Sequence, residues 1–264
     1  MPNHFEAIGF AVRDEDDVNA LASRAIREGQ LVRVAGGEYH RWTPGGGPEV
    51  WVQVTGRRWL GITPHFAGST SMRAGIVGRV RLPDDTPLEG HLYAWANPPA
   101  EGPLDAGDYP FVFAVPDFRT LDGMRVPVAA RVQIAAFAHD LELFATEEAY
   151  LAAQDPAMVF APESFIPAGM FGEEGEEPEP MALINGRVLA AERRENPAGM
   201  AFWWMHVRTL GGEVDVVAEE ALVAEPPVVG GMVSGEFYLT GRVTPDAPSA
   251  PAEERSWWRR VTGR

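Results

Sequence analysis

The feature that divides this chain most sharply is a short acidic stretch at residues 173–180, with the sequence Glu-Glu-Gly-Glu-Glu-Pro-Glu-Pro. Five carboxylates repel one another there, and two prolines oppose regular secondary structure. We therefore interpret residues 173–180 as a linker. It predicts two folding units, an N-terminal domain at residues 1–172 and a C-terminal domain at residues 181–245.

A second boundary follows the C-terminal domain. Residues 246–264 begin with a spacer rich in Pro and Ala, which predicts an extended, poorly ordered chain. They end in Arg-Ser-Trp-Trp-Arg-Arg-Val-Thr-Gly-Arg, which holds four Arg and two Trp. Three interpretations stay open for this tail: docking on an acidic partner, folding back on the acidic surface of the same chain, and a disordered end.

The formal net charge of −16 is distributed unevenly. Residues 1–172 carry nine of the net negative charges, the linker carries five, and residues 181–264 carry only two. Binding to nucleic acids and to anionic membranes needs a surplus of positive charge. Nucleic-acid binding is therefore not expected for residues 1–172, and for residues 181–245 it stays open but is disfavoured.

The chain contains no Cys and no Lys, so that all of its 22 basic residues are Arg. This excludes disulfides, thiolate zinc sites and cysteine nucleophiles, together with P-loop, Schiff-base and general-base lysines. The chain also has no apolar run of about 20 residues and no basic, apolar leader at its start. We expect a soluble, cytoplasmic protein.

The N-terminal domain shows the spacing of a mixed α+β unit. Residues 4–12 are typical of a strand, and Asp14 begins a helix that Gly29 ends. Strands are predicted at residues 30–35, 38–43, 49–55, 76–82, 91–97, 110–115 and 131–144, followed by a short helix at 146–154. The predicted class is α+β with mainly antiparallel sheets.

The segment His-Phe-Glu-Ala-Ile-Gly-Phe-Ala-Val at residues 4–12, the helix after it and the stretch from Tyr39 to Val54 resemble the first module of the vicinal oxygen chelate (glyoxalase-like) proteins. The resemblance implies a ligand cup built from two modules of one strand, one helix and three strands. In metal-dependent members it implies a divalent cation held by a His on the first strand and a residue on the fourth, here His4 with Glu49 or Gln53. The second module would have to be permuted or degenerate, because its strand and helix follow the other strands.

The C-terminal domain reads as strands at residues 181–193, 200–210, 213–218 and 232–243, with a helical turn at 219–222. Three meander strands, a short helix and a closing strand resemble an OB-fold, a small β-barrel often used to bind oligonucleotides or oligosaccharides. No fifth strand is evident within this domain.

Strand alternation then predicts which side chains of this domain face away from its core. Val233, Phe237 and Leu239 are expected inside. The expected outward face is aromatic and basic, made of Phe202, Trp204, His206, Arg208, Tyr238 and Arg242. Such a face can stack bases or sugars. The alternative, which we favour, is that it packs on the N-terminal domain or on another subunit.

Six His residues are present, and no two have the spacing of a local zinc motif. A metal site would have to be assembled from distant residues such as His4, His65, His139 and a carboxylate, Glu49 or Glu142. The loop predicted at residues 62–73 concentrates His65, three hydroxyl side chains and Arg73, a density that could hold an anionic or carbohydrate-like ligand. A purely structural role is the favoured interpretation of both patterns.

The whole chain also resembles a group of uncharacterised bacterial proteins, through the segments at residues 4–10, 64–66, 109–117 and 211–218. We therefore expect a non-catalytic binding or interaction protein whose ligand, a small molecule or a protein, is unknown. Two alternatives stay open: a metal-dependent enzyme of the vicinal oxygen chelate type, acting on a small carbonyl-containing substrate, and single-stranded nucleic-acid binding by the OB-like domain. Whether the chain forms a homo-oligomer is also open.

Overall fold

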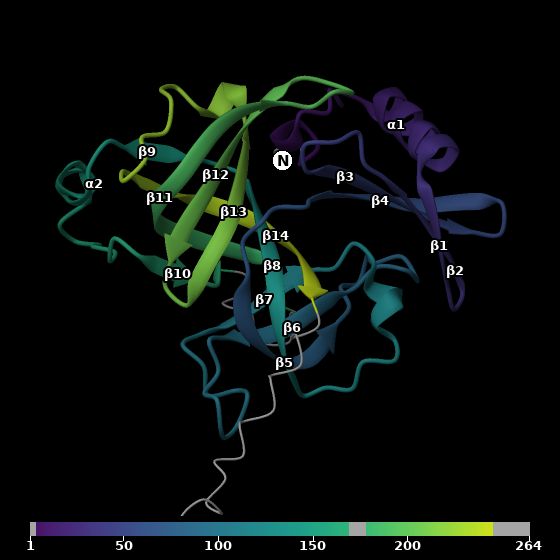
Figure 1. Ribbon diagram of the computed structural model, residues 1–264, viewed down its shortest axis with the longest axis horizontal. Helices are drawn as coiled ribbons and strands as arrows, with labels where there is room; N and C mark the ends of the chain where they lie inside the picture. Colours follow the sequence, from purple (N-terminus) through teal and green to yellow (C-terminus); the bar gives the residue numbers. More distant parts are fainter. Residues whose placement is uncertain (1–3, 169–177, 245–264) are drawn as a thin grey trace, which may run out of the picture.

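The computed structural model describes residues 4–168 and 178–244, and within them the protein is mainly β with two α-helices. Figure 1 shows a four-stranded sheet beside a larger, strongly curved sheet. Among the described residues, no helix is long and apolar enough to cross a membrane. The predicted tail at residues 246–264 and most of the predicted linker lie outside the described residues.

The small sheet is antiparallel in the order β1-β2-β3-β4, with bounds Gln30–Val34, Gly37–Trp42, Pro48–Thr55 and Arg58–Phe66. Helix α1 (Glu15–Glu28) precedes it. The Asp14 side chain caps the helix by accepting a hydrogen bond from the Asp17 amide, and three acidic residues in the first turn complement the helix dipole. At the other end, the amide of Gly29 bonds to the carbonyl of Ala25. These local signals are in the sequence, and the prediction of this helix is confirmed.

The large sheet has ten strands and is mixed, in the order β10-β11-β12-β13-β8-β5-β6-β7-β14-β9, with additional pairings of β11 and β8 to β14. Its strands are β5 (Met72–Val80), β6 (His91–Ala96), β7 (Pro110–Ala114), β8 (Val128–Ala138), β9 (Glu142–Phe144), β10 (Ser164–Ile166), β11 (Met181–Glu195), β12 (Ala201–Thr209), β13 (Gly212–Glu219) and β14 (Met232–Thr244). Strand β13 pairs with β8 in parallel. Strands from both sides of residues 173–180 thus belong to one sheet, and the carbonyl of Pro180 accepts a hydrogen bond from the Leu239 amide at 2.7 Å.

The predicted strand at residues 4–12 is wrong. The segment instead forms a short 3-10 helix, η1 (Glu6–Ile8), and ends in Gly9 with a positive φ of 76°. Its backbone bonds to the loop between β11 and β12, where the Met200 amide donates to the Gly9 carbonyl at 2.6 Å and Asn196 Nδ2 donates to the Ile8 carbonyl at 2.9 Å. Residues 4–12 therefore do not form a strand of either sheet, although Ala7, Ile8, Phe10 and Val12 are buried.

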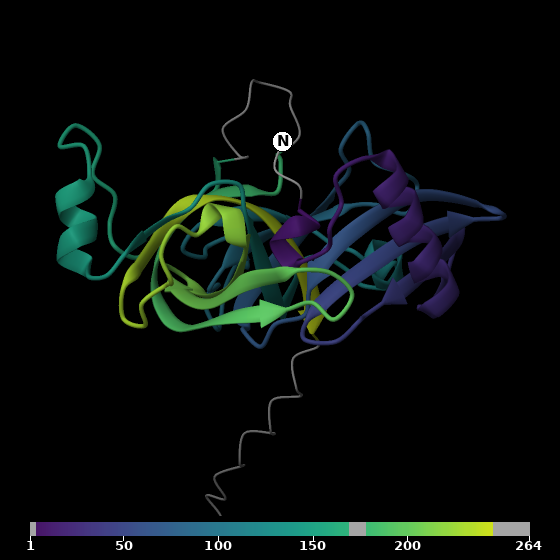
Figure 2. The ribbon, with the colours of Figure 1, turned by 90° about the horizontal axis from the view of Figure 1, so that it is seen from above.

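The predicted loop at residues 62–73 is also wrong in extent. Residues 62–66 belong to β4 and residues 72–73 to β5, so only residues 67–71 connect the two sheets. The sequence analysis missed β4, and it merged β8 and β9 into one strand at 131–144. Helix α2 (Glu147–Ala153) agrees with the prediction, and its N-cap Thr146 accepts a hydrogen bond from the Ala149 amide. Figure 2 shows α2 and α1 at opposite ends of the molecule.

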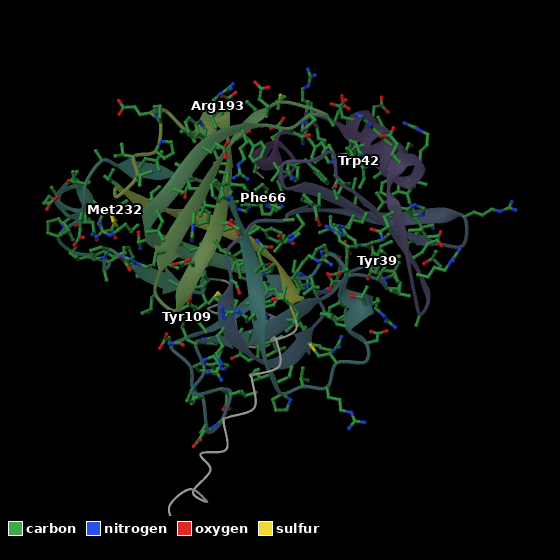
Figure 3. The ribbon with its side chains drawn as sticks, in the orientation of Figure 1. Tyr39, Trp42, Phe66, Tyr109, Arg193 and Met232 are labelled. Carbon is green, nitrogen blue, oxygen red and sulfur yellow. The ribbon has the colours of Figure 1, made fainter. Side chains whose placement is uncertain are left out.

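The main hydrophobic core lies inside the large sheet. It joins residues of β5–β8 with residues of β11–β14, among them Val207, Val233, Phe237 and Leu239, all fully buried. A second core fills the space between the two sheets, where the ring of Phe66, labelled in Figure 3, lies edge-on to the Phe202 ring with 6.0 Å between centroids. Burying aromatic rings from both sheets stabilises their association, because each ring removes a large apolar area from water.

Candidate functional site

The longest polar pattern that faces out of the main core is a row on β14. Val233, Phe237 and Leu239 point into the core as predicted. From Ser234 to Arg242 the alternate positions are polar, and we call them the β14 polar row: Ser234, Glu236, Tyr238, Thr240 and Arg242. Because successive side chains of a strand point to opposite faces, this row follows one outer face of the large sheet.

At the Ser234 end of the row there is an open hollow of about 280 Å³. Eight residues line it: Asp140, Leu141, Glu142, Phe160, Leu183, Asn185, Ser234 and Gly235. Among the described residues, its ionisable lining consists of two carboxylates, Asp140 and Glu142, without any Lys, Arg or His. Phe160, Leu141 and Leu183 give it an apolar wall. The hollow therefore combines negative charge with apolar surface.

Hydrogen bonds fix the polar side chains of this hollow. Ser234 Oγ lies 2.7 Å from Asn185 Oδ1 and donates to it, and Asn185 Nδ2 donates to Ser164 Oγ at 2.8 Å. Asp140 Oδ1 accepts from the Glu236 amide at 2.6 Å, which holds the turn between β8 and β9 against β14. The site is thus built on strands and a fixed turn, and it needs no large rearrangement to accept a ligand.

Next along the row, two histidines meet. His4 Nε2 lies 2.7 Å from His139 Nε2, and the His4 ring is stacked between His139 and Tyr238, with centroids 5.0 and 4.3 Å away. Burial lowers the pKa of His4 to about 4, and the charge of His139 adds to this effect. Burial also lowers the pKa of His139, although Glu236 and Asp140 oppose the shift. Both rings are neutral at pH 7, so one donates its proton to the other.

Thr240 contacts the most deeply buried histidine, His65 of β4, whose Nδ1 lies 2.7 Å from the Thr240 hydroxyl. Within the described part of the chain, its Nε2 has no hydrogen-bond partner. Burial lowers the pKa of His65 to about 4, although the neighbouring Glu49 opposes this. His65 is therefore neutral at pH 7.

Glu49 lies opposite His65 across the β3–β4 pairing. It accepts from the Arg41 guanidinium and, at 2.9 Å, from the Trp51 indole. Burial by itself would raise the pKa of Glu49, but His65 and the Arg41 guanidinium outweigh burial and lower it. A paired, ionised carboxylate is thus held at the interface between the sheets.

The last residue of the row, Arg242, donates to Asp117 Oδ2 at 2.8 Å and lies over the Trp51 ring at 5.1 Å. Arg41 lies over the same ring at 5.5 Å. Two guanidinium groups therefore contact Trp51, and each is also paired with a carboxylate.

The metal set implied by the vicinal oxygen chelate resemblance is not brought together. His4 contacts His139 and Tyr238, whereas Glu49 is paired with Arg41, and Gln53 bonds to Thr63 and Glu89. Within residues 4–168 and 178–244, no group of three or more His, Cys, Asp or Glu side chains has an arrangement that could hold a metal ion. The predicted metal candidates are brought together only in pairs, His4 with His139 and Glu49 with His65.

The predicted aromatic face is largely covered. Phe202 is fully buried and Trp204 is 8% exposed, both in the core between the two sheets, as the favoured alternative predicted. His206 and Arg208 are paired with carboxylates: His206 Nε2 lies 2.7 Å from Glu213, and Arg208 Nη2 donates to Glu163 at 2.9 Å. The two rings are not available for stacking bases or sugars.

The sequence analysis missed the role of Asp215, whose carboxylate is completely buried. It accepts hydrogen bonds from the amides of Ser69 and Thr70, the Thr70 hydroxyl, the Gln133 amide and the Trp204 indole, at 2.6–3.4 Å. The hydroxyl-rich connection between the sheets is therefore held by Asp215. Arg73, another predicted ligand residue, donates to the carbonyl of Pro99 at 3.4 Å instead.

Comparisons with family models, with curated proteins and with solved structures found no match to this chain.

Proposed function

We propose that this chain is a non-catalytic binding protein that holds a small organic cation with an apolar body in the hollow at the Ser234 end of the β14 polar row. The observation that supports this most directly is the lining of the hollow, where Asp140 and Glu142 face a ligand space without a basic residue and Phe160 and Leu183 supply apolar contact. Cations are further favoured by the net charge of −16, which raises their concentration near the surface.

The same observations separate the hollow from the rest of the row. At Thr240 and Arg242, each polar group already has a partner from β4 or from Asp117. At the hollow, Asp140 accepts a hydrogen bond from the Glu236 amide, but no basic side chain of the described residues pairs with Asp140 or Glu142. A ligand that supplies a cation there gains charge-assisted hydrogen bonds without displacing an existing ion pair.

The two alternatives from the sequence have no such support. A metal-dependent enzyme needs a third ligand beside His4 and His139. Single-strand binding through Phe202 and Trp204 needs the two sheets to separate.

For the finer fold we propose an OB-like unit with a permuted fifth strand. Strands β11, β12 and β13 form a meander, η4 (Glu220–Leu222) follows, and β14 pairs with β11. Strand β8 pairs with β13 in parallel and with β14 in antiparallel orientation, so it takes the place of the strand that residues 181–245 lack. For the N-terminal part, helix α1 followed by β1–β4 supports a glyoxalase-like module, and the missing first strand is a departure from it.

The binding proposal is tested by isothermal titration calorimetry with three compounds of similar shape. These are 2-phenylethylammonium, neutral 2-phenylethanol and anionic 3-phenylpropionate. We expect the cation to bind most tightly and the anion most weakly, because only the cation pairs with Asp140 and Glu142. Equal affinities for the cation and the anion, or no binding of the cation, would contradict the proposal.

One double variant that removes both charges, together with one control, makes the test specific. The double variant Asp140→Asn, Glu142→Gln keeps the shape of the hollow and the acceptor that Asp140 offers to the Glu236 amide. We expect it to weaken cation binding about tenfold, the size of one lost charged hydrogen bond. The control, Glu225→Gln, removes a charge from an exposed loop outside the hollow and is expected to leave the affinity unchanged.

A further inference from the structure

The acidic, apolar hollow has a candidate occupant within its own chain. The last ten residues, Arg255–Arg264, hold four of the 22 Arg of the protein and two adjacent Trp. This segment thus offers what the hollow lacks, cations next to flat apolar rings. Resting on the proposed function of the hollow, we propose that the Arg/Trp segment of the same chain binds in it and competes with any external cation.

The side-chain types of the Arg/Trp segment are complementary to those that line the hollow. Asp140 and Glu142 can accept from a guanidinium, which presents paired donors suited to carboxylates. Phe160 and Leu183 can pack against an indole ring, and Leu183 is 36% exposed although it is a large apolar residue. An exposed leucine beside an apolar wall is the kind of surface that a second apolar group covers.

The length of the chain permits the contact. Strand β14 ends at Thr244, and Ser234 lies ten residues earlier on the same strand, about 33 Å back at ~3.3 Å per residue. From Thr244 the chain runs 11 residues to Arg255 and 20 to Arg264, so it can reach from about 36 to about 66 Å. The chain after Thr244 is therefore long enough for the Trp pair and the three later Arg to reach the hollow around the outside of the sheet.

The tether makes an intramolecular contact effective even if it is weak. Covalent attachment through a segment of this length gives the tail an effective concentration near the hollow on the order of millimolar. An external cation must compete with that concentration, so the tail would set a threshold for ligand binding.

The absence of Cys from the whole chain permits a direct test by disulfide trapping in the full-length protein. The test variant carries Leu183→Cys and Ser256→Cys, which place one thiol on the wall of the hollow and one beside the Trp pair. The matched control carries Leu31→Cys and Ser256→Cys, because Leu31 is equally exposed, at 39%, but lies on β1 of the small sheet. We expect the intramolecular disulfide to form several-fold faster in the test variant, and Asp140→Asn with Glu142→Gln to remove that advantage.

Other results would overturn the inference. Equal rates in the test and control variants would mean that the tail has no preferred site. Disulfide-linked dimers whose yield rises with protein concentration would place the tail in a second copy of the chain instead.

A second measurement separates this inference from the proposed function. In the full chain, Trp257→Ala with Trp258→Ala is expected to strengthen binding of 2-phenylethylammonium several-fold, because the competing segment is weakened. If the probe binds but trapping shows no preference for Leu183, the inference fails and the proposed function stands. If trapping is selective but the probe never binds, even with both Trp removed, the hollow serves the tail alone and the small-cation function fails.

Discussion

Replacing the buried His65 tests how the interface between the two sheets responds to acid. The pKa of His65 is lowered by burial from 6.5 to about 4, so the unfolded chain takes up its proton before the folded chain does. The stability contribution is complete above pH 6.5 and is lost as the pH falls from 6.5 towards 4. At 1.36 kcal/mol per pKa unit, this single group costs about 2 kcal/mol by pH 5 and about 3 kcal/mol by pH 4.

The variant His65→Gln removes the titrating group and keeps a polar atom that can bond to the Thr240 hydroxyl. Urea unfolding at pH 7.5 and pH 4 gives the loss of stability for each protein. We expect the loss in the variant to be smaller than in the wild type by about 3 kcal/mol, even if the variant is less stable at both pH values.

A control variant and one contradicting outcome complete this test. The control His206→Gln, which alters a half-buried histidine beside Glu213, should keep the wild-type loss because His65 is intact. Parallel losses in the wild type and in His65→Gln would refute the reasoning, since they would mean that His65 is protonated as easily in the folded protein as in the unfolded chain.

Three further sets of substitutions address the small sheet and its packing on the large sheet, and all are measured by urea unfolding at pH 7.5. Asp215→Ala leaves five buried donors without their acceptor and is expected to cost about 3–5 kcal/mol, whereas Asp215→Asn, which keeps one acceptor oxygen, should cost less. Phe202→Ala should cost about 3–5 kcal/mol, because it opens a cavity between the sheets, and a loss below 1 kcal/mol would argue against this core. Gly36→Ala should cost about 1 kcal/mol through its positive φ alone, and Gly47→Ala clearly more, because a Cβ there would also overlap the Phe66 ring.

Local signals predicted the elements whose determinants lie close together in the sequence. Helix α1 begins at its capping Asp14 and ends at Gly29, because these residues satisfy the free backbone groups of the helix ends. The inward side of β14 was equally predictable, since alternation alone places Phe237 and Leu239 in the core.

The errors come from pairings between distant residues. Residues 4–12 have the apolar content of a strand, but their backbone is satisfied by Asn196 and Met200, nearly 190 residues away. The parallel pairing of β8 with β13, with Ala135 opposite Asp215, joins positions 80 residues apart. No local pattern encodes such contacts, because what decides them is the packing of both faces of a strand at once.

The same limit applies to the candidate site. Sequence alternation placed Tyr238 and Arg242 on the outer face of β14, and the structure confirms that they do not point into the main core. It could not say that His4 stacks on Tyr238 or that Asp117 pairs with Arg242, because those partners come from other parts of the chain. The sequence analysis gave Asp215 no role in the site, and its burial becomes evident only from the five hydrogen bonds that its carboxylate accepts from other segments.

The β14 polar row shows how the fold distributes its charge. At the closed end of the row, the carboxylates of Asp117 and Glu49 are paired with Arg242 and Arg41, as burial requires. At the open end, the part of the chain that the structure describes lines the hollow with the carboxylates of Asp140 and Glu142 and with no basic residue. Uncompensated charge is tolerated there because water still solvates it, and it is also where a cation from outside the described residues gains the most. The Arg/Trp segment and a small organic cation therefore compete for the same two carboxylates. Disulfide trapping can be measured with and without 2-phenylethylammonium. We expect the probe to slow disulfide formation in the Leu183→Cys variant and to leave it unchanged in the Leu31→Cys variant.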